Sequence, residues 1–224
     1  MGYYINLQNI DLNKYMTILK SADLLPSRLV LKHDIDKHFE RIKSSGVVNL
    51  EEYLERTKTK RKLQDFSKQY EVDENYLTIL TREIKSYLKP PCKLKDFPGI
   101  PAKIVLTLKE KGLNNTLQFF EYSLTPAKRK KLSMETGVSE EWILKLARFT
   151  DLCRIRWVNH TFAFILIGTG YDSAQNIAST NVSELHEKVN RFIEENGLFK
   201  VRIGLHDIKL CIEAAKNLSF DMIF

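Results

Sequence analysis

The sequence predicts an all-α protein built from tandem helical repeats. Helix-forming residues dominate the 224-residue chain, and the alternating apolar and polar runs typical of strands are scarce. Only 9 Gly and 6 Pro are present, so long flexible linkers are not expected. In addition, one segment recurs along the chain with the same spacing of apolar residues. We therefore expect helix-hairpin-helix-like repeats with an N-terminal extension and a C-terminal helix.

The repeat is defined by a constant offset. Gly46 and Gly112 are 66 residues apart (112 − 46), as are Val72 and Val138 (138 − 72). Apolar positions between these anchors keep their character: Ile42 and Leu108, Val47 and Leu113, Tyr53 and Phe119, Leu54 and Phe120, Phe66 and Leu132, Tyr76 and Trp142, Leu77 and Ile143, Leu80 and Leu146. A shorter third copy starts at Gly170, 58 residues after Gly112 (170 − 112). Retained core positions with a drifting surface are typical of structural repeats.

These offsets divide the chain into four parts. We expect an N-terminal extension over 1–28, repeat 1 over 29–89, repeat 2 over 93–151, and repeat 3 with the C-terminal helix over 152–224. The clearest boundary is Pro90-Pro91, because two successive prolines cannot continue a helix.

The N-terminal part contains one predicted helix. Residues 1–10 are expected to be extended. Asp11 or Asn13 can cap a helix that runs through Leu19, and the Leu25-Pro26 step ends this element because the residue before proline avoids helical geometry.

In repeats 1 and 2 the helix starts are marked by capping residues. Asn49 with Glu52 three residues later is a capping-box-like signal. Asp73 is placed to cap the following helix of repeat 1. In repeat 2, Gly112 ends one helix and Asn115 caps the next.

The later helices follow the same logic. Thr125 with Pro126 at the first helical position opens a basic helix, and Ser139 opens another. Ser183 is expected to cap a helix that stops near Gly197. A last helix is predicted from about Asp207 to Asn217.

Part of the chain resembles a known family. The arrangement F-P-G-I-x-x-x-I-V-x-x-L-x-x-x-G-L-x-N-T begins at Phe97, and T-G-V-S-E-E-W-I-L (Thr136–Leu144) is followed by D-L-C-R-I (Asp151–Ile155). These segments resemble the DUF4332 family, a helix-hairpin-helix-related family of uncharacterised function, over Leu94–Arg191. The resemblance implies tandem helical hairpins similar to those in DNA polymerases, ligases and repair proteins. It brings no catalytic residues.

The hairpin loops depart from a phosphate-binding pattern. Such loops read h-x-G-h-G, and their backbone N–H groups together with the following helix start hold a phosphate. Repeat 2 keeps Gly99 but has Pro101, which lacks an N–H, at the second glycine position. Repeat 3 has Trp157 and Asn159 instead, and repeat 1, around His33–Asp36, has neither glycine. We expect two loops to be unable to bind phosphate and the third to be impaired.

Basic residues offer a second route to nucleic acid. The chain has 35 Lys and Arg against 28 Asp and Glu, a net charge of +7. Two runs stand at or before equivalent helix starts: Lys58, Lys60, Arg61, Lys62 and Lys128, Arg129, Lys130, Lys131. They could form a two-part track along a phosphate backbone. Alternatively, they are a solvated helical face whose charge is offset elsewhere.

A local group surrounds Trp157. Arg154, Arg156 and His160 lie close to it in sequence, and an aromatic ring beside arginines can stack on a base or on a partner side chain. Alternatively, Trp157 fills the interior between repeats 2 and 3.

No pattern indicates catalysis, a metal or a cofactor. No phosphate loop, nucleophile elbow or zinc-protease motif occurs. His33 and His38 are five apart, which does not place them on one helical face, so a metal site with Asp34 and Asp36 is not expected. We expect no enzyme, no catalytic residue, no metal ligand and no cofactor.

The expected location is the cytoplasm. Cys92, Cys153 and Cys211 are widely spaced without a C-x-x-C, which favours a reducing compartment. The N-terminus lacks signal-peptide features, and the longest apolar run, Phe162–Ile167, is too short for a bilayer.

Together these patterns predict a non-enzymatic binding module. The first hypothesis is non-sequence-specific contact with DNA or RNA. Its expected contact residues are Lys58, Lys60, Arg61, Lys62, Gly99, Lys128, Arg129, Lys130, Lys131, Arg154 and Arg156. The alternative is a protein–protein interaction adaptor in which the hairpins are only scaffold and Trp157 contacts the partner.

Overall fold

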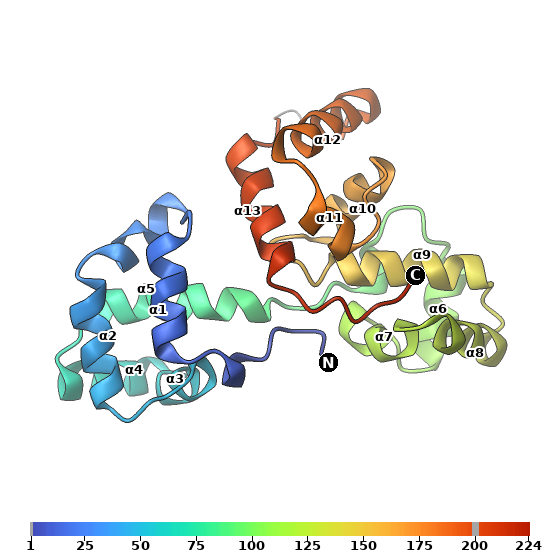
Figure 1. Cartoon of the computed structure of the whole chain (residues 1–224). Helices are drawn as coiled ribbons and strands as arrows, with labels where there is room; N and C mark the ends of the chain where they lie inside the picture. Colours follow the sequence, from blue (N-terminus) through green and yellow to red (C-terminus); the bar gives the residue numbers. More distant parts are fainter. Residues whose placement is uncertain (1, 199–201) are drawn as a thin grey trace. The chain divides into compact units, whose positions relative to one another are not determined.

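The computed structural model of the chain describes residues 2–198 and 202–224, and those residues form an all-α protein, as the sequence predicts (Figure 1). The chain divides into two compact units. The N-terminal unit is Ile5–Leu88, and the C-terminal unit is Lys89–Phe224 together with Met1–Tyr4. Within the described ranges no helix has both the length and the apolar character that crossing a bilayer requires.

The N-terminal unit packs its helices around one apolar core. Its elements are η1 (Leu7–Asn9), α1 (Leu12–Ser21), η2 (Pro26–Lys32), α2 (Ile35–Ser44), α3 (Leu50–Arg56), α4 (Lys60–Tyr70), α5 (Glu74–Lys85) and η3 (Ser86–Leu88). Leu31, Phe39, Tyr53 and Leu77 are fully buried at its centre. The side chain of Asp73 accepts the Tyr76 N–H at 2.7 Å, so α5 starts where the sequence predicts.

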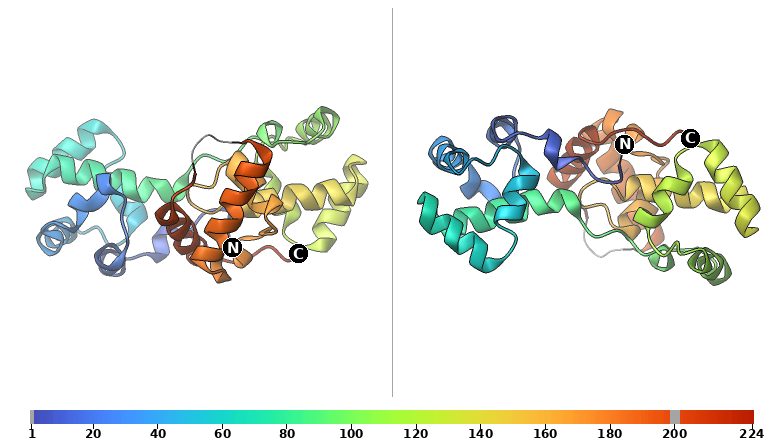
Figure 2. Two further views of the ribbon diagram at one scale, coloured as in Figure 1. Left: turned by 90° about the horizontal axis from the view of Figure 1, so that it is seen from above. Right: turned by 90° about the horizontal axis from the view of Figure 1, so that it is seen from below.

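The C-terminal unit is built around α9. Its elements are η4 (Leu94–Asp96), α6 (Ala102–Glu110), α7 (Thr116–Ser123), α8 (Pro126–Thr136), α9 (Glu140–Leu152), α10 (His160–Gly168), α11 (Ala174–Ser179), α12 (Val182–Asn196) and α13 (Leu205–Lys216). Helices α7, α8 and α10 pack on α9, while α11 and α12 pack on α13. After α13 the chain runs back to the α7–α8 connection, where the Ile223 N–H donates to the Leu124 carbonyl at 2.8 Å (Figure 2).

The sequence offsets reappear in the helix bounds. Helix α4 spans 60–70 and α8 spans 126–136, an offset of 66 at both ends (126 − 60 and 136 − 70). Helix α6 spans 102–110 and α10 spans 160–168, an offset of 58 at both ends (160 − 102 and 168 − 110). Ser67 donates to the Val72 carbonyl and Ser133 to the Val138 carbonyl, each at 2.6 Å. Equivalent sequence positions therefore make equivalent structural contacts.

Helix α1 belongs to the N-terminal unit, and the backbone at its start pairs with the backbone at the start of α3. The Leu12 N–H donates to the Val48 carbonyl at 3.2 Å, and the Leu50 N–H donates to the Ile10 carbonyl at 3.1 Å. The C-terminal unit has the same two-way pairing where residues 92–94 meet residues 114–116. The chain before Pro26, expected as an extension, thus contributes a backbone pairing that the equivalent copy also contains.

Three element bounds differ from expectation. The lead expected to be extended contains η1. Helix α12 begins at Val182, because Asn181 and not Ser183 is the cap: its Oδ1 accepts the Ser183 N–H at 2.8 Å and the Glu184 N–H at 3.3 Å. Helix α13 begins two residues earlier than predicted, at Leu205.

Candidate functional site

Each of the three hairpin loops identified in the sequence contains a residue in the left-handed backbone conformation. Gly99 (φ +74°) precedes α6, Trp157 (φ +70°) precedes α10, and Asp34 (φ +46°) precedes α2. Gly99 and Trp157 are 58 residues apart (157 − 99), which is the offset of the helices that follow them. The loss of glycine has therefore not removed this bend, although the left-handed conformation costs a bulky side chain of order 1–2 kcal/mol.

The start of α6 is open. Gly99, Pro101, Ala102 and Lys103 are all exposed. No side chain caps the helix, and its first turn contains no acidic residue. The first backbone N–H groups of a helix have no intrahelical partner and lie at the positive end of its dipole. Here Pro101 contributes no N–H, and the Ile104 N–H donates to the Pro101 carbonyl at 3.0 Å, so the donors left are those of Ala102 and Lys103. The geometry suits an anion.

The other two starts are less suited to an anion. At α10 the Asn159 side chain accepts the Phe162 N–H at 2.9 Å and so occupies the position an anion would take. At α2 the first turn contains Asp36, whose carboxylate accepts a hydrogen bond from Lys20 at 2.5 Å. Of the three, only α6 combines a left-handed glycine with an uncapped, carboxylate-free start.

The first basic run lies at the start of α4 in the N-terminal unit. Lys58, Lys60, Arg61 and Lys62 are all exposed, and they surround Thr59, whose side chain caps α4. Lys58 pairs with Glu55 at 2.7 Å, and Arg61 lies 4.0 Å from Asp65. Such exposed pairs contribute little, so the side chains are available to a polyanion.

The second basic run lies on α8 in the C-terminal unit. Lys128, Lys130 and Lys131 are exposed. Lys128 lies 3.7 Å from Glu121, and Lys131 lies 3.8 Å from Glu135. Within the described ranges, Lys130 forms no ion pair.

The expectation that Arg129 contacts nucleic acid is wrong. Its side chain is buried, and Nη1 donates to the Ser123 carbonyl at 2.8 Å. The guanidinium lies 5.4 Å from the centre of the Phe224 ring, and burial lowers the Arg129 pKa. The sequence contains the signal, because the 66-residue offset places Arg129 on the buried Leu63 (129 − 66).

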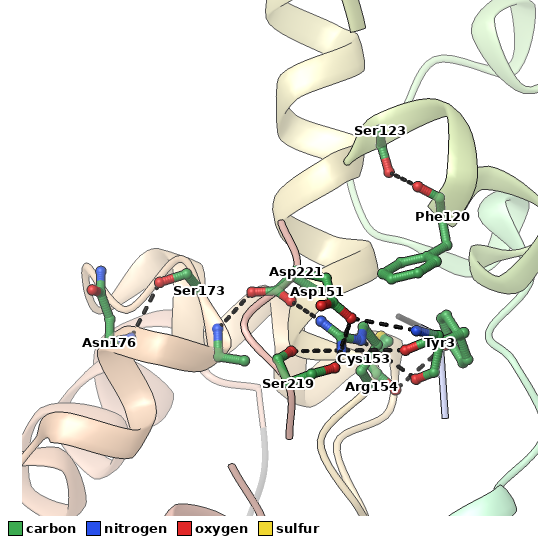
Figure 3. Close-up of polar contacts among 12 residues, drawn as sticks. Tyr3, Phe120, Ser123, Asp151, Cys153, Arg154, Ser173, Asn176, Ser219 and Asp221 are labelled. Atoms are coloured by element: carbon green, nitrogen blue, oxygen red, sulfur yellow. Dashed lines mark hydrogen bonds and ion pairs between the residues drawn. The ribbon is translucent and has the colours of Figure 1, made fainter. Parts of the chain in front are cut away.

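Arg154 is also misassigned as a nucleic-acid contact. Its side chain is 1% exposed and lies at the centre of a buried polar cluster (Figure 3). Nη1 pairs with Asp151 at 2.8 Å, and Nη2 donates to the Ser219 carbonyl at 2.7 Å. Nε donates to the Tyr3 carbonyl at 3.4 Å. Arg154 therefore holds α9, the N-terminal segment and the chain after α13 together.

Asp151 completes the cluster. Its second oxygen accepts the Ala174 N–H at 2.8 Å, at the start of α11. Burial raises the Asp151 pKa, while that N–H and the Arg154 guanidinium act in the opposite direction. A buried carboxylate with these partners is a structural ion pair and not a ligand site.

Trp157 and Arg156 form a surface pair. The Arg156 guanidinium lies 4.0 Å from the Trp157 ring centre, and Trp157 is 42% exposed. The alternative that Trp157 fills the interior does not fit this exposure. Its neighbours Ile155 and Val158 are buried instead. The Val158 carbonyl accepts a hydrogen bond from the Lys89 ammonium.

His33 and His38, for which the sequence predicts no metal site, have other partners. His33 Nδ1 lies 3.4 Å from Asp34, and His38 stacks on Tyr76 with ring centres 3.8 Å apart. In the described part of the chain, no three His, Cys, Asp or Glu side chains converge as a metal site would require.

Sequence reasoning missed Lys103 and Ala102 at the open helix start. Pro101 provided a usable signal, since proline there both marks the helix boundary and cannot cap it through a side chain.

Comparison with known proteins identifies a family. The model of a family described as "Domain of unknown function (DUF4332)" matches residues 98–218. The matched segment starts within the loop before α6 and ends after α13. No curated protein and no solved structure matches the chain.

Proposed function

The chain belongs to the DUF4332 family, whose model covers more than half of it, and from that premise we propose that it is a non-enzymatic module that binds the phosphate backbone of nucleic acid. The start of α6 carries the proposal. A left-handed glycine, an uncapped helix and a first turn without carboxylates together present backbone N–H groups to an anion.

Charge around this site supports the same ligand. Lys95 and Lys103 flank the loop, and both are exposed. The chain carries a net charge of +7. A phosphate that bound at α6 would therefore have ammonium groups beside it. Binding through such contacts is independent of base sequence.

One observation favours the alternative, a protein–protein adaptor. Among the described residues of the C-terminal unit, nine large apolar side chains are exposed, and they include Met134 at 78%, Leu106 at 59% and Trp157 at 42%. Exposed apolar side chains are suited to a protein partner.

The test is fluorescence anisotropy with labelled single-stranded DNA, duplex DNA and duplex RNA across a salt series. The key variant is Pro101→Asp, which adds a capping carboxylate where the phosphate would bind. We expect at least about a tenfold loss of affinity, because a negative charge then occupies the helix start. The fold should be retained, since aspartate is a favourable cap.

A charge-matched control is Asn159→Asp, which adds the same charge at the already capped start of α10. Its affinity should stay within about twofold of the unmodified chain. Equal losses in both variants would mean that only net charge matters and would contradict a site at α6. No binding of any probe at low salt would contradict the proposal and leave the adaptor function.

A further inference from the structure

A cavity of about 300 Å³ is formed by α7 and α8 of the C-terminal unit, two helices that pack against each other (Figure 1). Its volume lies at the lower end of the range for small-molecule sites, so it is of a size for one small ligand. One aromatic, one aliphatic and four charged side chains line it, namely Tyr122, Leu132, Glu121, Lys128, Lys131 and Glu135. We call this cavity the α7–α8 pocket.

Tyr122 provides an accessible aromatic ring in the pocket. It lies in α7 and is 41% exposed, whereas Phe119 and Phe120 of the same helix are buried. Leu132 of α8 is buried and adds an apolar side chain to the lining. An accessible ring beside an apolar side chain suits a flat, aromatic group of a ligand.

Two ammonium groups of the pocket have only loose partners. Lys128 Nζ lies 3.7 Å from Glu121, and Lys131 Nζ lies 3.8 Å from Glu135. Both distances are too long for a hydrogen bond. Glu135 instead accepts a hydrogen bond from the Lys111 ammonium, which lowers the pKa of that carboxyl. Among the described residues, neither the Lys128 nor the Lys131 ammonium donates a hydrogen bond, so both can donate to a phosphate.

The two carboxylates of the lining are compatible with a nucleotide. Lys111, Lys128 and Lys131 supply three positive charges against the two negative charges of Glu121 and Glu135. Carboxylate oxygens are hydrogen-bond acceptors, and nucleobases carry N–H donors on their edges. The same lining can therefore contact a phosphate through its ammonium groups and a base edge through its carboxylates.

The N-terminal unit shows that folding does not require this lining. Helices α3 and α4 pack against each other as α7 and α8 do. The 66-residue offset places Arg56 at the position of Tyr122 (122 − 66) and Asp65 at the position of Lys131 (131 − 66). The helix pair thus forms without the aromatic ring and with the opposite charge, so its packing does not account for Tyr122 and Lys131.

We propose that the α7–α8 pocket binds one unpaired nucleotide of a single strand, with the base on the Tyr122 ring and a phosphate at Lys128 and Lys131. This inference rests on the proposed binding of nucleic acid and adds a requirement to it. The start of α6 accepts a phosphate of any strand, whereas the pocket accepts only a base that is free of its stack. Single strands therefore gain a contact that duplexes lack.

The first test is fluorescence anisotropy with a labelled oligo(dA) strand and a duplex of the same length. Tyr122→Ala should lower the affinity for the single strand about tenfold, because base stacking is lost, and should leave the affinity for the duplex within about twofold. Tyr122→Phe keeps the ring and should bind the single strand within about twofold of the unmodified chain. The fold should be retained, since the side chain is exposed.

Phe220→Ala is the matched control. It removes an aromatic side chain of similar exposure, 46%, that does not line the pocket. Its affinity for both probes should stay within about twofold of the unmodified chain. Equal losses of single-strand affinity in Tyr122→Ala and Phe220→Ala, or no loss in Tyr122→Ala, would overturn the pocket and leave phosphate binding at α6 intact.

The second test uses adenosine monophosphate, a single nucleotide, and saturation-transfer NMR. We expect transfer from the unmodified chain to the adenine protons, equal transfer in Pro101→Asp, and at least about threefold weaker transfer in Tyr122→Ala. No transfer in the unmodified chain, or loss of transfer in Pro101→Asp, would overturn the pocket. Transfer that depends on Tyr122, without binding of any polymer, would contradict the site at α6 and retain the pocket as a nucleotide site.

Discussion

The turns before α6 and α10 have the same backbone bend but present different chemistry. Gly99 and Trp157 are 58 residues apart and differ by only 4° in φ (+74° and +70°). Phe97 and Ile155, two residues before the bends, are both buried. The first turn then opens on an uncapped helix, whereas the second carries an exposed indole, an arginine and a capped helix.

The difference shows which parts of a repeat are fixed by folding. The buried apolar residue and the left-handed bend persist in both copies, so packing and chain direction require them. The residue at the bend itself can change from glycine to tryptophan, at the cost of backbone strain. The residues that determine the fold of a turn are therefore not the same as those that determine what it can bind.

The largest expected effect on the free energy of unfolding comes from the buried charge that precedes the second turn. Arg154, three residues before Trp157, is buried, whereas Asp96, the equivalent residue before Gly99 (154 − 58), is exposed. Arg154→Met leaves the Asp151 carboxylate buried without its partner, and we expect the free energy of unfolding to fall by about 3–5 kcal/mol. Urea denaturation monitored by circular dichroism measures this.

Asp96→Ala is the matched control and should change stability by no more than about 0.5 kcal/mol, because an exposed side chain is removed. If both substitutions lower the free energy of unfolding equally, the buried Arg154–Asp151 ion pair does not stabilise the region of the second turn. The proposed contrast with exposed Asp96 at the first turn would then be wrong.

A smaller effect should reveal the strain itself. Gly99→Ala should cost about 1 kcal/mol, because alanine in the left-handed region is strained even though open space surrounds the added methyl group. At the second turn, Trp157→Gly should be more stable than Trp157→Ala by a similar amount, about 1 kcal/mol, since both lose the indole and only glycine relieves the bend.

Thermal and urea unfolding of these variants gives the two differences directly. If alanine and glycine are equally stable at position 157 but not at 99, the backbone at Trp157 is not held in the left-handed region in solution.

The sequence predicts where the helices start, but it does not predict which charged side chains are buried. Caps such as Asn115 and Ser139 act on groups three residues away, so local pattern locates them well. Arg154 instead bonds to the Tyr3 and Ser219 carbonyls, 151 and 65 residues distant. No local rule brings such partners together, and an arginine is exposed by default.

Arg129 is an intermediate case, since the repeat offset places it on Leu63 and could have indicated burial. Contacts within a repeat were thus predictable, and contacts between copies or with the chain ends were not.

The smallest expected effect tests whether the α8 lysines extend the site at α6. Lys130→Ala should leave stability within about 0.5 kcal/mol, because the side chain is exposed and forms no ion pair within the described ranges. If a bound polyanion reaches α8 from the start of α6, loss of one phosphate contact should lower the slope of log affinity against log salt by about 1. Lys131→Ala should lower it less, since Glu135 lies 3.8 Å from that ammonium and already neutralises part of its charge. If the slope is unchanged in both variants while Pro101→Asp still abolishes binding, the contact is confined to the open start of α6. The turns before α6 and α10 would then differ in function only through that helix start.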